Sequence, residues 1–308
     1  MMAMMYRLQI WLCAIMLGAG VAVGQTLIEV PGEGTFPEGI ALDASTGELF
    51  VGGAGDGSIH RIDVDTGAAT ALLEPGSRPP FTTLGLALGP DGSLWLAGGG
   101  SGTIVQFDRA SGDAVATFET PDADNTLIND VIVAPNGDVF ATDSFRPALF
   151  RVAAGDAAAE VFVDFEGTVF EYGEGVNSNG LVVSSDGEVI IVVAMNTGTL
   201  YRIDVATREV SEIDVDGGPF TGGDGLVLDG STLYVAQQGP DVVAVIELAD
   251  DFASGQHVDT ITDESFTQIA TIALGDGALY VVNTQFGAMQ SDDGPSLPFT
   301  VTVIDVSN

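Results

Sequence analysis

The chain has 308 residues, 41 of them glycine, with few aromatic residues and no long helical pattern, so one large all-β domain is expected. Its 8 basic residues, all arginine, stand against 44 acidic residues and give a net charge of −36. This charge argues against nucleic acid as a partner, and it fits either a salt-rich habitat or a direct use of the negative field.

Residues 1–24 have the pattern of a secretory signal peptide. Arg7 supplies a positive charge, residues 10–17 are almost wholly apolar, and the small residues of GAGVAVG follow. The apolar run is short for a membrane span, so cleavage near Gly24 is predicted ahead of a retained anchor. The mature domain, residues 25–308, is then secreted or periplasmic and free of the membrane. Because Cys13 lies within the signal, that domain has no thiol, which excludes disulfides and cysteine-bound metals.

A repeat of about 45 residues runs through the rest of the chain and indicates a propeller-like array. Six units are found, and their starts are 46, 45, 50, 45 and 46 residues apart. Their first strands and turns read EGIALDASTGE from Glu38, LGLALGPDGS from Leu84, NDVIVAPNGD from Asn129, NGLVVSSDGE from Asn179, DGLVLDGS from Asp224 and ATIALGDGA from Ala270.

Each unit continues with a turn that is usually rich in Asp-Gly or Asn-Gly, then with second and third strands such as LFVGG and IHRIDV. These turns favour tight antiparallel hairpins. A fourth strand follows in most units, for example AATALLE, AVATFET, AEVFVDF and EVSEIDV. The sequence therefore predicts a six-bladed β-propeller with four antiparallel strands in each blade. Unit six lacks a fourth strand, and the segment TLIEV, Thr26 to Val30, is predicted to close this last blade.

Alignment of the units gives each blade one residue at the start of its innermost strand, where it faces the central channel. Two of the six are apolar, Leu84 and Ala270, and four are oxygen donors: Glu38, Asn129, Asn179 and Asp224. Hard oxygen ligands with a combined charge of −2 suit Ca²⁺, and the absence of Cys and His argues against zinc or copper. The alternative is a channel lined by polar side chains only because it is wet.

The residue after each of these positions is glycine in four units, which allows the backbones to approach closely at a crowded axis. Asp130 is an exception. It is predicted to hold Asn129 by a hydrogen bond or to bind a second cation, with a plain surface or turn role as the alternative.

Together these residues resemble the senescence-marker-protein/gluconolactonase superfamily, which is related to diisopropyl fluorophosphatase and the paraoxonases. The resemblance lies in Glu38 of the first inner strand, Asn129-Asp130 of the third, Asn179-Gly180 of the fourth and Asp224-Gly225 of the fifth, and it covers all six units. It implies a calcium-dependent hydrolase of lactones or related esters, with Glu38, Asn129, Asn179 and Asp224 as the Ca²⁺ ligands. By the same resemblance, Asp224 is the catalytic general base or nucleophile.

Substrate contacts are predicted from the loops at the channel mouth that holds these ligands. The candidates are Arg146, Asp143, Phe145, Asn196, Gln238, Asn283 and Phe286. Arg146 is the one cation among them, and a surface ion pair is its alternative role. The last loop, residues 283–298, is the longest and is predicted to act either as a lid or as an acidic tip.

Three functions therefore stay open at this point. The first is a monomeric secreted lactonase acting on a small molecule with Ca²⁺. The second is a noncatalytic propeller, stabilised by Ca²⁺, that binds a partner or glycan. The third is a lyase or another enzyme on the same scaffold, because propellers support many chemistries.

Overall fold

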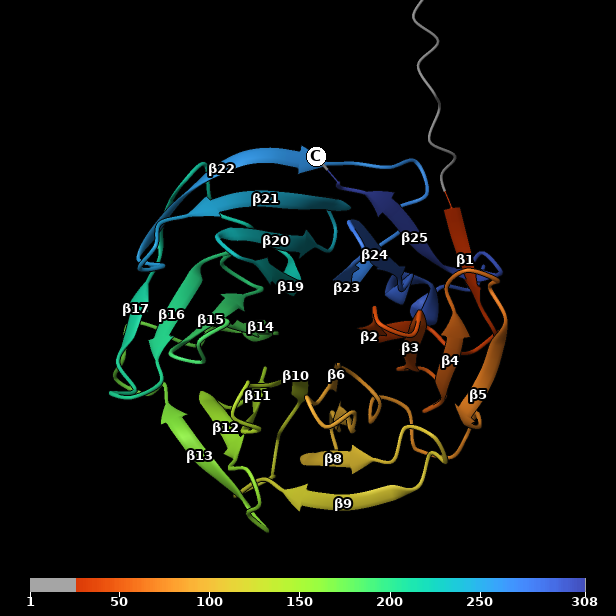
Figure 1. Ribbon diagram of the computed structural model, residues 1–308, viewed down its shortest axis with the longest axis horizontal. Helices are drawn as coiled ribbons and strands as arrows, with labels where there is room; N and C mark the ends of the chain where they lie inside the picture. The colour runs from red at the N-terminus through yellow and green to blue at the C-terminus, as the bar shows by residue number, and fades with distance from the viewer. Residues whose placement is uncertain (1–25, 308) are drawn as a thin grey trace, which may run out of the picture.

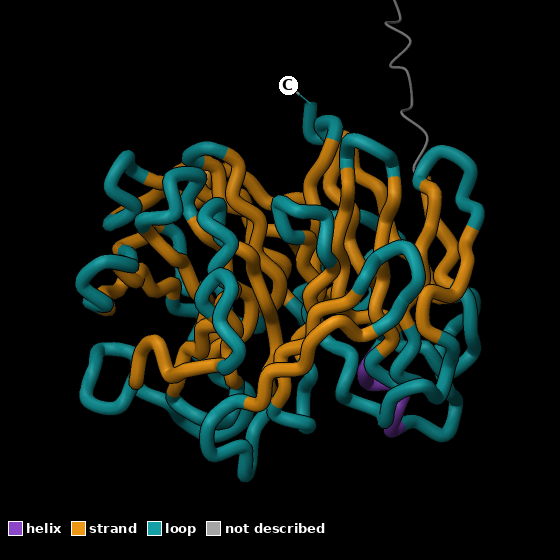
Figure 2. Tube along the Cα trace, turned by 60° about the horizontal axis from the view of Figure 1, so that its bottom comes forward, coloured by secondary structure: helices purple, strands orange, loops and turns teal. Residues whose placement is uncertain are grey.

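The computed structural model describes residues 26–307, which form a ring of six β-sheets around a central channel (Figure 1). The predicted six-bladed β-propeller is confirmed. Strands account for nearly all of the regular structure, and one short 3-10 helix, η1 (Phe286–Gln290), lies in a loop at one end of the molecule (Figure 2). The signal peptide predicted for residues 1–24 lies outside the described residues.

Blades 1 to 3 each contain four antiparallel strands in chain order from the channel outward. Blade 1 contains β2 (Pro37–Asp43), β3 (Glu48–Gly53), β4 (Ile59–Asp63) and β5 (Ala69–Leu73). Blade 2 contains β6 (Leu86–Leu88), β7 (Leu94–Ala97), β8 (Thr103–Phe107) and β9 (Ala114–Glu119). Blade 3 contains β10 (Ile128–Val133), β11 (Val139–Asp143), β12 (Ala148–Val152) and β13 (Ala159–Asp164).

Blades 4 to 6 follow this plan with two differences at their outer edges: blade 5 has a fifth strand, and the fourth strand of blade 6 comes from the beginning of the described chain. Blade 4 contains β14 (Ser178–Val183), β15 (Val189–Ala194), β16 (Leu200–Asp204) and β17 (Val210–Glu212). Blade 5 contains β19 (Gly223–Asp229), β20 (Thr232–Gln237), β21 (Val242–Leu248), β22 (Ser254–Ile261) and, outermost, β18 (Asp214–Asp216). Blade 6 contains β23 (Ile269–Gly275), β24 (Ala278–Asn283), β25 (Phe299–Asp305) and β1 (Thr26–Val30).

The ring is closed by β1, as predicted. This strand pairs antiparallel with β25, from Thr26 opposite Val303 to Val30 opposite Phe299. The first described strand and the last therefore lie side by side in one blade (Figure 1). The pairing covers the outer edge of β25, which would otherwise offer unpaired backbone groups to another chain.

The segment EVSEIDV departs from the prediction of a single fourth strand in blade 4. It divides at Ile213, so that β17 pairs with β16 while β18 joins blade 5 by parallel pairing with β22. Ile213 is almost completely buried among apolar residues of blades 4 and 5, and its backbone N–H donates to the carbonyl of Leu200. The division therefore follows from burying one isoleucine between two blades, which turns the chain toward its neighbour.

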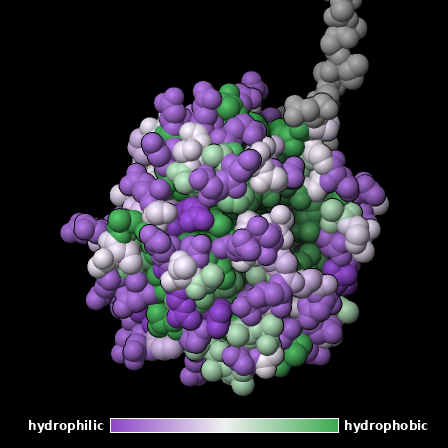
Figure 3. Space-filling view, turned by 60° about the vertical axis from the view of Figure 1, so that its left-hand side comes forward, coloured by the Kyte–Doolittle hydropathy of each residue, from purple (hydrophilic) through white to green (hydrophobic). Residues whose placement is uncertain are grey.

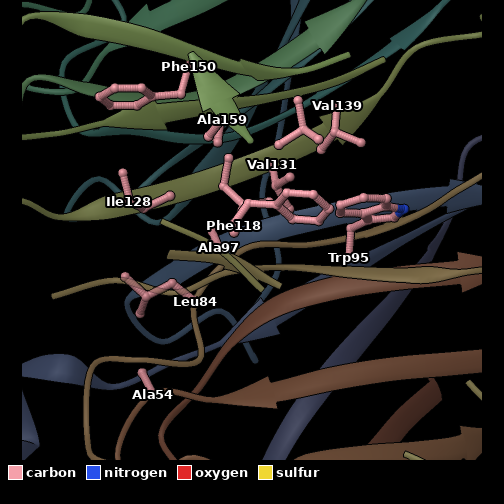
Figure 4. Close-up of a cluster of buried hydrophobic side chains, with 13 residues drawn as sticks. Ala54, Leu84, Trp95, Ala97, Phe118, Ile128, Val131, Val139, Phe150 and Ala159 are labelled. Atoms are coloured by element: carbon pink, nitrogen blue, oxygen red, sulfur yellow. The ribbon is translucent and has the colours of Figure 1, made fainter. Parts of the chain in front are cut away.

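Apolar side chains fill the spaces between adjacent blades rather than one central core. The cluster in Figure 4 combines side chains mainly from blades 2 and 3, with Ala54 from just after the end of β3 in blade 1. The rings of Trp95 and Phe118 stack there with their centroids 5.7 Å apart. All six residues of β15 are buried because both faces of its sheet contact another blade. The outer surface is different: the face in Figure 3 is largely hydrophilic. No helix in residues 26–307 is long and apolar enough to cross a membrane.

Candidate metal and substrate site

A β-bulge recurs at the same place in five innermost strands. In β2, Pro37 pairs with Gly53 and the next pair is Ile40 with Val51, so one extra residue enters the inner strand between them. The same register shift occurs in β10, β14, β19 and β23. The predicted ligands of blades 1, 3, 4 and 5 are the first of the two residues enclosed by each shift. A bulge redirects side chains relative to the strand, and here it brings four oxygen donors to one pocket.

Glycines behind the ligands allow the inner strands to pack against each other. A Cβ atom on Gly39 would lie 2.2 Å from the carbonyl oxygen of Leu84, and one on Gly180 would lie 2.0 Å from that of Asp224. Both distances are shorter than any real Cβ contact, so a larger residue would push two blades apart. The sequence prediction gave these glycines the same role.

In blade 3, Asp130 stands at the position after the predicted ligand, where blades 1, 4 and 5 have glycine, and its side chain is buried. Its carboxylate accepts hydrogen bonds from the backbone N–H of Val131 at 2.9 Å and of Leu181, in the next blade, at 3.3 Å. The amide of Asn129 donates instead to the Ser144 hydroxyl, at 2.8 Å. Asp130 thus joins blades 3 and 4 and lines a separate cavity of about 300 Å³ in the apolar part of the channel. The support that was predicted from Asp130 to Asn129 is supplied in the structure by Ser144.

The four predicted ligands, called the ring residues from here on, are buried. Their exposed fractions are 3% for Glu38, Asn179 and Asp224 and 6% for Asn129. Three of their oxygens have no hydrogen-bond partner among residues 26–307: Glu38 Oε2, Asn179 Oδ1 and Asp224 Oδ1. Buried polar atoms are nearly always paired, and each unpaired one costs about 1–3 kcal/mol. Three of them facing one pocket therefore indicate a missing ligand.

Burial and mutual repulsion shape the charge of the site. Burial, with the nearby carboxylates of Asp224 and Asp130, raises the pKa of Glu38 well above its ordinary value. Burial, followed by repulsion from Asp130, raises the pKa of Asp224 to about 7. Burial also raises the pKa of Asp130 to about 7, against the lowering effect of its two backbone donors. A cation among these groups would relieve the repulsion and favour their charged forms.

This donor set fits Ca²⁺. Two carboxylates and two amide oxygens are hard ligands, and Ca²⁺ accepts six to eight oxygens with water completing the shell. The three unpaired oxygens are the atoms such an ion would satisfy. The set contains no His or Cys, the ligands that zinc and copper commonly use. Within residues 26–307, no group of three or more His, Cys, Asp or Glu side chains is placed to hold a metal.

Above the ring residues lies a pocket of about 180 Å³. Its lining residues come from blade ends and from the links between blades. The polar ones are the four ring residues and Gln238, and the apolar ones are Phe81, Leu84, Leu127, Val176, Met195 and Phe286. Sequence reasoning assigned no substrate contact to Phe81, Leu127, Val176 or Met195. A signal did exist for three of them, since Phe81, Leu127 and Val176 each lie two or three positions before the aligned inner-strand residue of their own blade.

Two of the seven predicted substrate contacts line this pocket, Gln238 and Phe286. The side chain of Phe145 is 42% exposed and lies outside the lining. Asn196 is also exposed, and its amide donates to Asn177 at 2.9 Å. Asn283 is buried. Its Oδ1 accepts from the backbone N–H of residue 267, and its Nδ2 donates to the hydroxyls of residues 300 and 302.

Asp143 and Arg146, also predicted as contacts, bind each other rather than lining the pocket. Arg146 Nε donates to Asp143 Oδ2 at 2.7 Å, and the guanidinium also donates to both hydroxyls of Thr120 and Thr126 and to the carbonyls of residues 121 and 122. The ion pair thereby fixes the link between blades 2 and 3.

The long loop of residues 283–298 is held at its base. The side-chain amide of Gln285 donates to the carbonyl of Ser296 at 2.9 Å and accepts from the N–H of the same residue at 2.8 Å. The N–H of Gly287 donates to Gln268 Oε1 at 2.6 Å. Helix η1 begins inside this clamp and carries Phe286 to the pocket.

Known proteins of the same architecture carry several activities. A gluconolactonase from Xanthomonas campestris superposes with a TM-score of 0.65 at 16% identity, covering 91% of this chain and 89% of its own. Regucalcin from Agrobacterium tumefaciens, described as a calcium-binding protein, gives a TM-score of 0.66 at 19% identity over 88% and 90%. Virginiamycin B lyase from Staphylococcus aureus gives 0.60 at 14% over 89% and 82%. At these identities the likeness establishes the fold alone.

Sequence comparison is more specific about family. No curated protein matches the chain at a significant level. The model of the SMP-30/gluconolactonase/LRE-like region, however, matches residues 36–285, which span all six inner strands and the four ring residues. This chain therefore belongs to the SMP-30/gluconolactonase/LRE-like family.

Proposed function

We propose that this protein is a calcium-dependent hydrolase of lactones or related esters. The observation that carries the proposal is the group of three unpaired oxygens, from Glu38, Asn179 and Asp224, at the floor of a pocket with apolar walls. Membership of a family that includes gluconolactonases supports the reaction class.

The four ring residues would hold the ion, with Asn129 oriented by Ser144. A bound Ca²⁺ supplies Lewis-acid polarisation of an ester carbonyl and stabilises the negative charge that develops on its oxygen. The protein supplies position and a partly water-free environment: Leu84, Leu127 and Met195 enclose the reacting carbonyl beside the ring.

Asp224 is the residue proposed for proton transfer. Its carboxylate takes a proton from an attacking water, whose oxygen forms a bond to the carbonyl carbon. The ring C–O bond of the lactone then breaks, and the leaving alkoxide recovers the proton from Asp224. The product is the open hydroxy acid, whose negative charge is repelled by a protein of net charge −36.

We also propose that the protein acts after export, on the basis of the signal-like residues 1–24. Extracellular calcium modules commonly bind with dissociation constants of about 10⁻⁴–10⁻³ M, so a site with only two carboxylates is adequate there.

Chelation and restoration of calcium test the function. With lactones and aryl esters as substrates, turnover should vanish in excess chelator, return with Ca²⁺, and fall at least 100-fold in Asp224→Asn. The matched control is Asp229→Asn, the same substitution at the exposed far end of β19. Calcium-dependent thermal stability without turnover across both substrate classes would instead favour a noncatalytic propeller whose ion stabilises the ring.

A further inference from the structure

The pocket walls offer few polar groups beyond the four ring residues. The remaining lining is apolar except for Gln238. Two phenyl rings, of Phe81 and Phe286, lie next to each other with centroids 6.4 Å apart. The wall thus resembles a small hydrophobic cavity with one polar group, and its volume of about 180 Å³ is below the roughly 300–1,000 Å³ of common ligand pockets.

None of the residues within 26–307 that line the pocket is positively charged. Arg146, the cation predicted to face the substrate, uses its guanidinium on Asp143, on two threonines and on backbone carbonyls. A Ca²⁺ ion bound by Glu38 and Asp224 would offset their charge, but an anionic group of the substrate away from that ion would meet no cationic side chain in the lining and a strongly negative protein.

Gln238 provides one uncommitted hydrogen-bond donor. Its Nε2 atom is buried and has no partner among the described residues. Its own backbone is fixed, since its N–H donates to the carbonyl of Gly222 at 2.7 Å. The neighbouring Gln237 differs, because its amide donates to the carbonyl of Thr221 at 3.0 Å. A buried, unpaired amide that lines a pocket is placed to bond one oxygen of a ligand.

The aromatic walls are formed before any ligand arrives. Phe286 is held by the clamp at the base of its loop. Phe81 has a positive φ of 56°, which is unusual for a bulky residue, and its N–H donates to the carbonyl of Ala54 at 2.7 Å. Its own carbonyl accepts from the N–H of Gly100 at 3.0 Å. Non-glycine residues held at such positive φ angles tend to occur at functional sites.

We infer that the site selects uncharged lactones with a short aliphatic substituent over polyhydroxylated and anionic lactones, and that Gln238 donates a hydrogen bond to the bound lactone. The inference rests on the proposed function and deepens it. Each hydroxyl buried without a partner should lower kcat/KM roughly tenfold, while each methylene that enters the apolar pocket should raise it roughly fourfold.

A substrate series on the calcium-loaded full chain tests the selection. The series contains γ-butyrolactone, γ-valerolactone and γ-caprolactone, compared with D-glucono-1,5-lactone and with a butyrolactone that carries a carboxylate. We expect kcat/KM to rise along the aliphatic series and to be at least tenfold lower for the other two. Preference for the sugar or carboxylated lactone would overturn the inference while leaving the proposed function in place.

Binding of non-hydrolysable lactams, measured by calorimetry, separates this inference from catalysis. γ-Valerolactam should bind at least tenfold more tightly than a polyhydroxylated lactam. If no lactone is turned over but this order holds, the hydrolase proposal fails and the selectivity stands. If the order is reversed or absent, the selectivity is wrong regardless of turnover.

Substitution of Gln238 tests the proposed donor. Gln238→Leu should weaken γ-valerolactam binding roughly five- to tenfold. Gln256→Leu, the same change on the exposed outer strand β22, should leave it unchanged. Circular dichroism and thermal melting check that both variants fold. Unaltered lactam binding in folded Gln238→Leu would refute the donor role.

Discussion

Two buried polar clusters lie near the same channel mouth, and they differ in how completely they are hydrogen-bonded. Asp143, the last residue of β11 in blade 3, accepts five hydrogen bonds from three backbone N–H groups, a threonine hydroxyl and the Arg146 guanidinium. Asp224, in the ring of predicted ligands, has an oxygen with no partner in the described part of the chain. Both carboxylates are almost fully buried, so burial alone does not distinguish them.

The difference separates structural from functional acids in this molecule. A carboxylate whose acceptor positions are all filled by its own chain stabilises that chain and has little to offer a ligand. A carboxylate buried with open positions lowers the stability of the empty protein and is explained only by something that binds. The sequence made both residues site candidates, Asp224 as a metal ligand and catalytic residue and Asp143 as a substrate contact. The completeness of their hydrogen bonds leaves only Asp224 open to a ligand.

The largest expected effect comes from removing Asp143. Asp143→Ala leaves Arg146 and three backbone donors without their acceptor, and the free energy of unfolding should fall by about 3–5 kcal/mol. Urea unfolding with excess calcium measures this loss. The calcium affinity of the folded fraction should be unchanged. A variant that keeps its stability but loses calcium affinity would move Asp143 into the metal site and remove the contrast.

Calcium itself should stabilise the protein by binding to the cluster of Asp224 and the other ring residues. At a free Ca²⁺ concentration of 100 times the dissociation constant, the free energy of unfolding should rise by about 2.7 kcal/mol for a single site. Thermal melting with Ca²⁺ and with chelator measures this shift. In Asp224→Asn the shift should largely disappear, while Asp229→Asn should keep it. A full shift in Asp224→Asn would show that the ion binds elsewhere.

The metal-free protein should lose stability as pH rises. Folded Asp224 has a pKa of about 7, against about 3.9 for an unfolded Asp, so between these values the folded chain retains a proton that the unfolded chain has released. The free energy of unfolding must then decrease with rising pH, by about 2–3 kcal/mol between pH 5 and 8.

Urea unfolding in chelator at both pH values tests this direction. The Asp229→Asn control accounts for repulsion among the many surface acids, and Asp224→Asn should show a flatter dependence than that control. Equal slopes in the two variants would mean that the buried carboxylate of Asp224 is charged in the empty site.

Much of the fold follows from the sequence because propellers repeat. Six similar units, their hairpin turns and the unpaired TLIEV segment determine the blade number, strand order and closure by β1. The ring residues could be aligned for the same reason: a bulge at one fixed position in five of the six inner strands keeps the repeat in register. Ile213 broke the pattern because its burial depends on a neighbouring blade.

Contacts outside the repeat could not be predicted in the same way. Arg146 was a candidate for substrate binding because it lies in a mouth loop, yet its guanidinium reaches carbonyls about 25 residues away in the preceding link. Those partners share no sequence pattern with it. The position of Phe81, three residues before Leu84, could have marked it as a pocket residue, but no motif indicates the positive φ with which it lines the pocket. Local periodicity thus located the ring, while its surroundings depended on long-range packing.

The smallest expected effect concerns the geometry of Arg146. Arg146→Lys keeps the charge beside Asp143 but loses the planar group that bonds Thr120 and the carbonyl of Asp122 at the same time, so the free energy of unfolding should fall by about 1 kcal/mol. Arg202→Lys, in a more open ion pair on β16, is the matched control and should change stability by less. Urea unfolding and calcium titration of both variants measure the outcome. Because Asp143 and Arg146 bond each other and their neighbours rather than the ring residues, the calcium affinity of Arg146→Lys should equal that of the wild type. A loss of affinity at unchanged stability would show that the two clusters are one site.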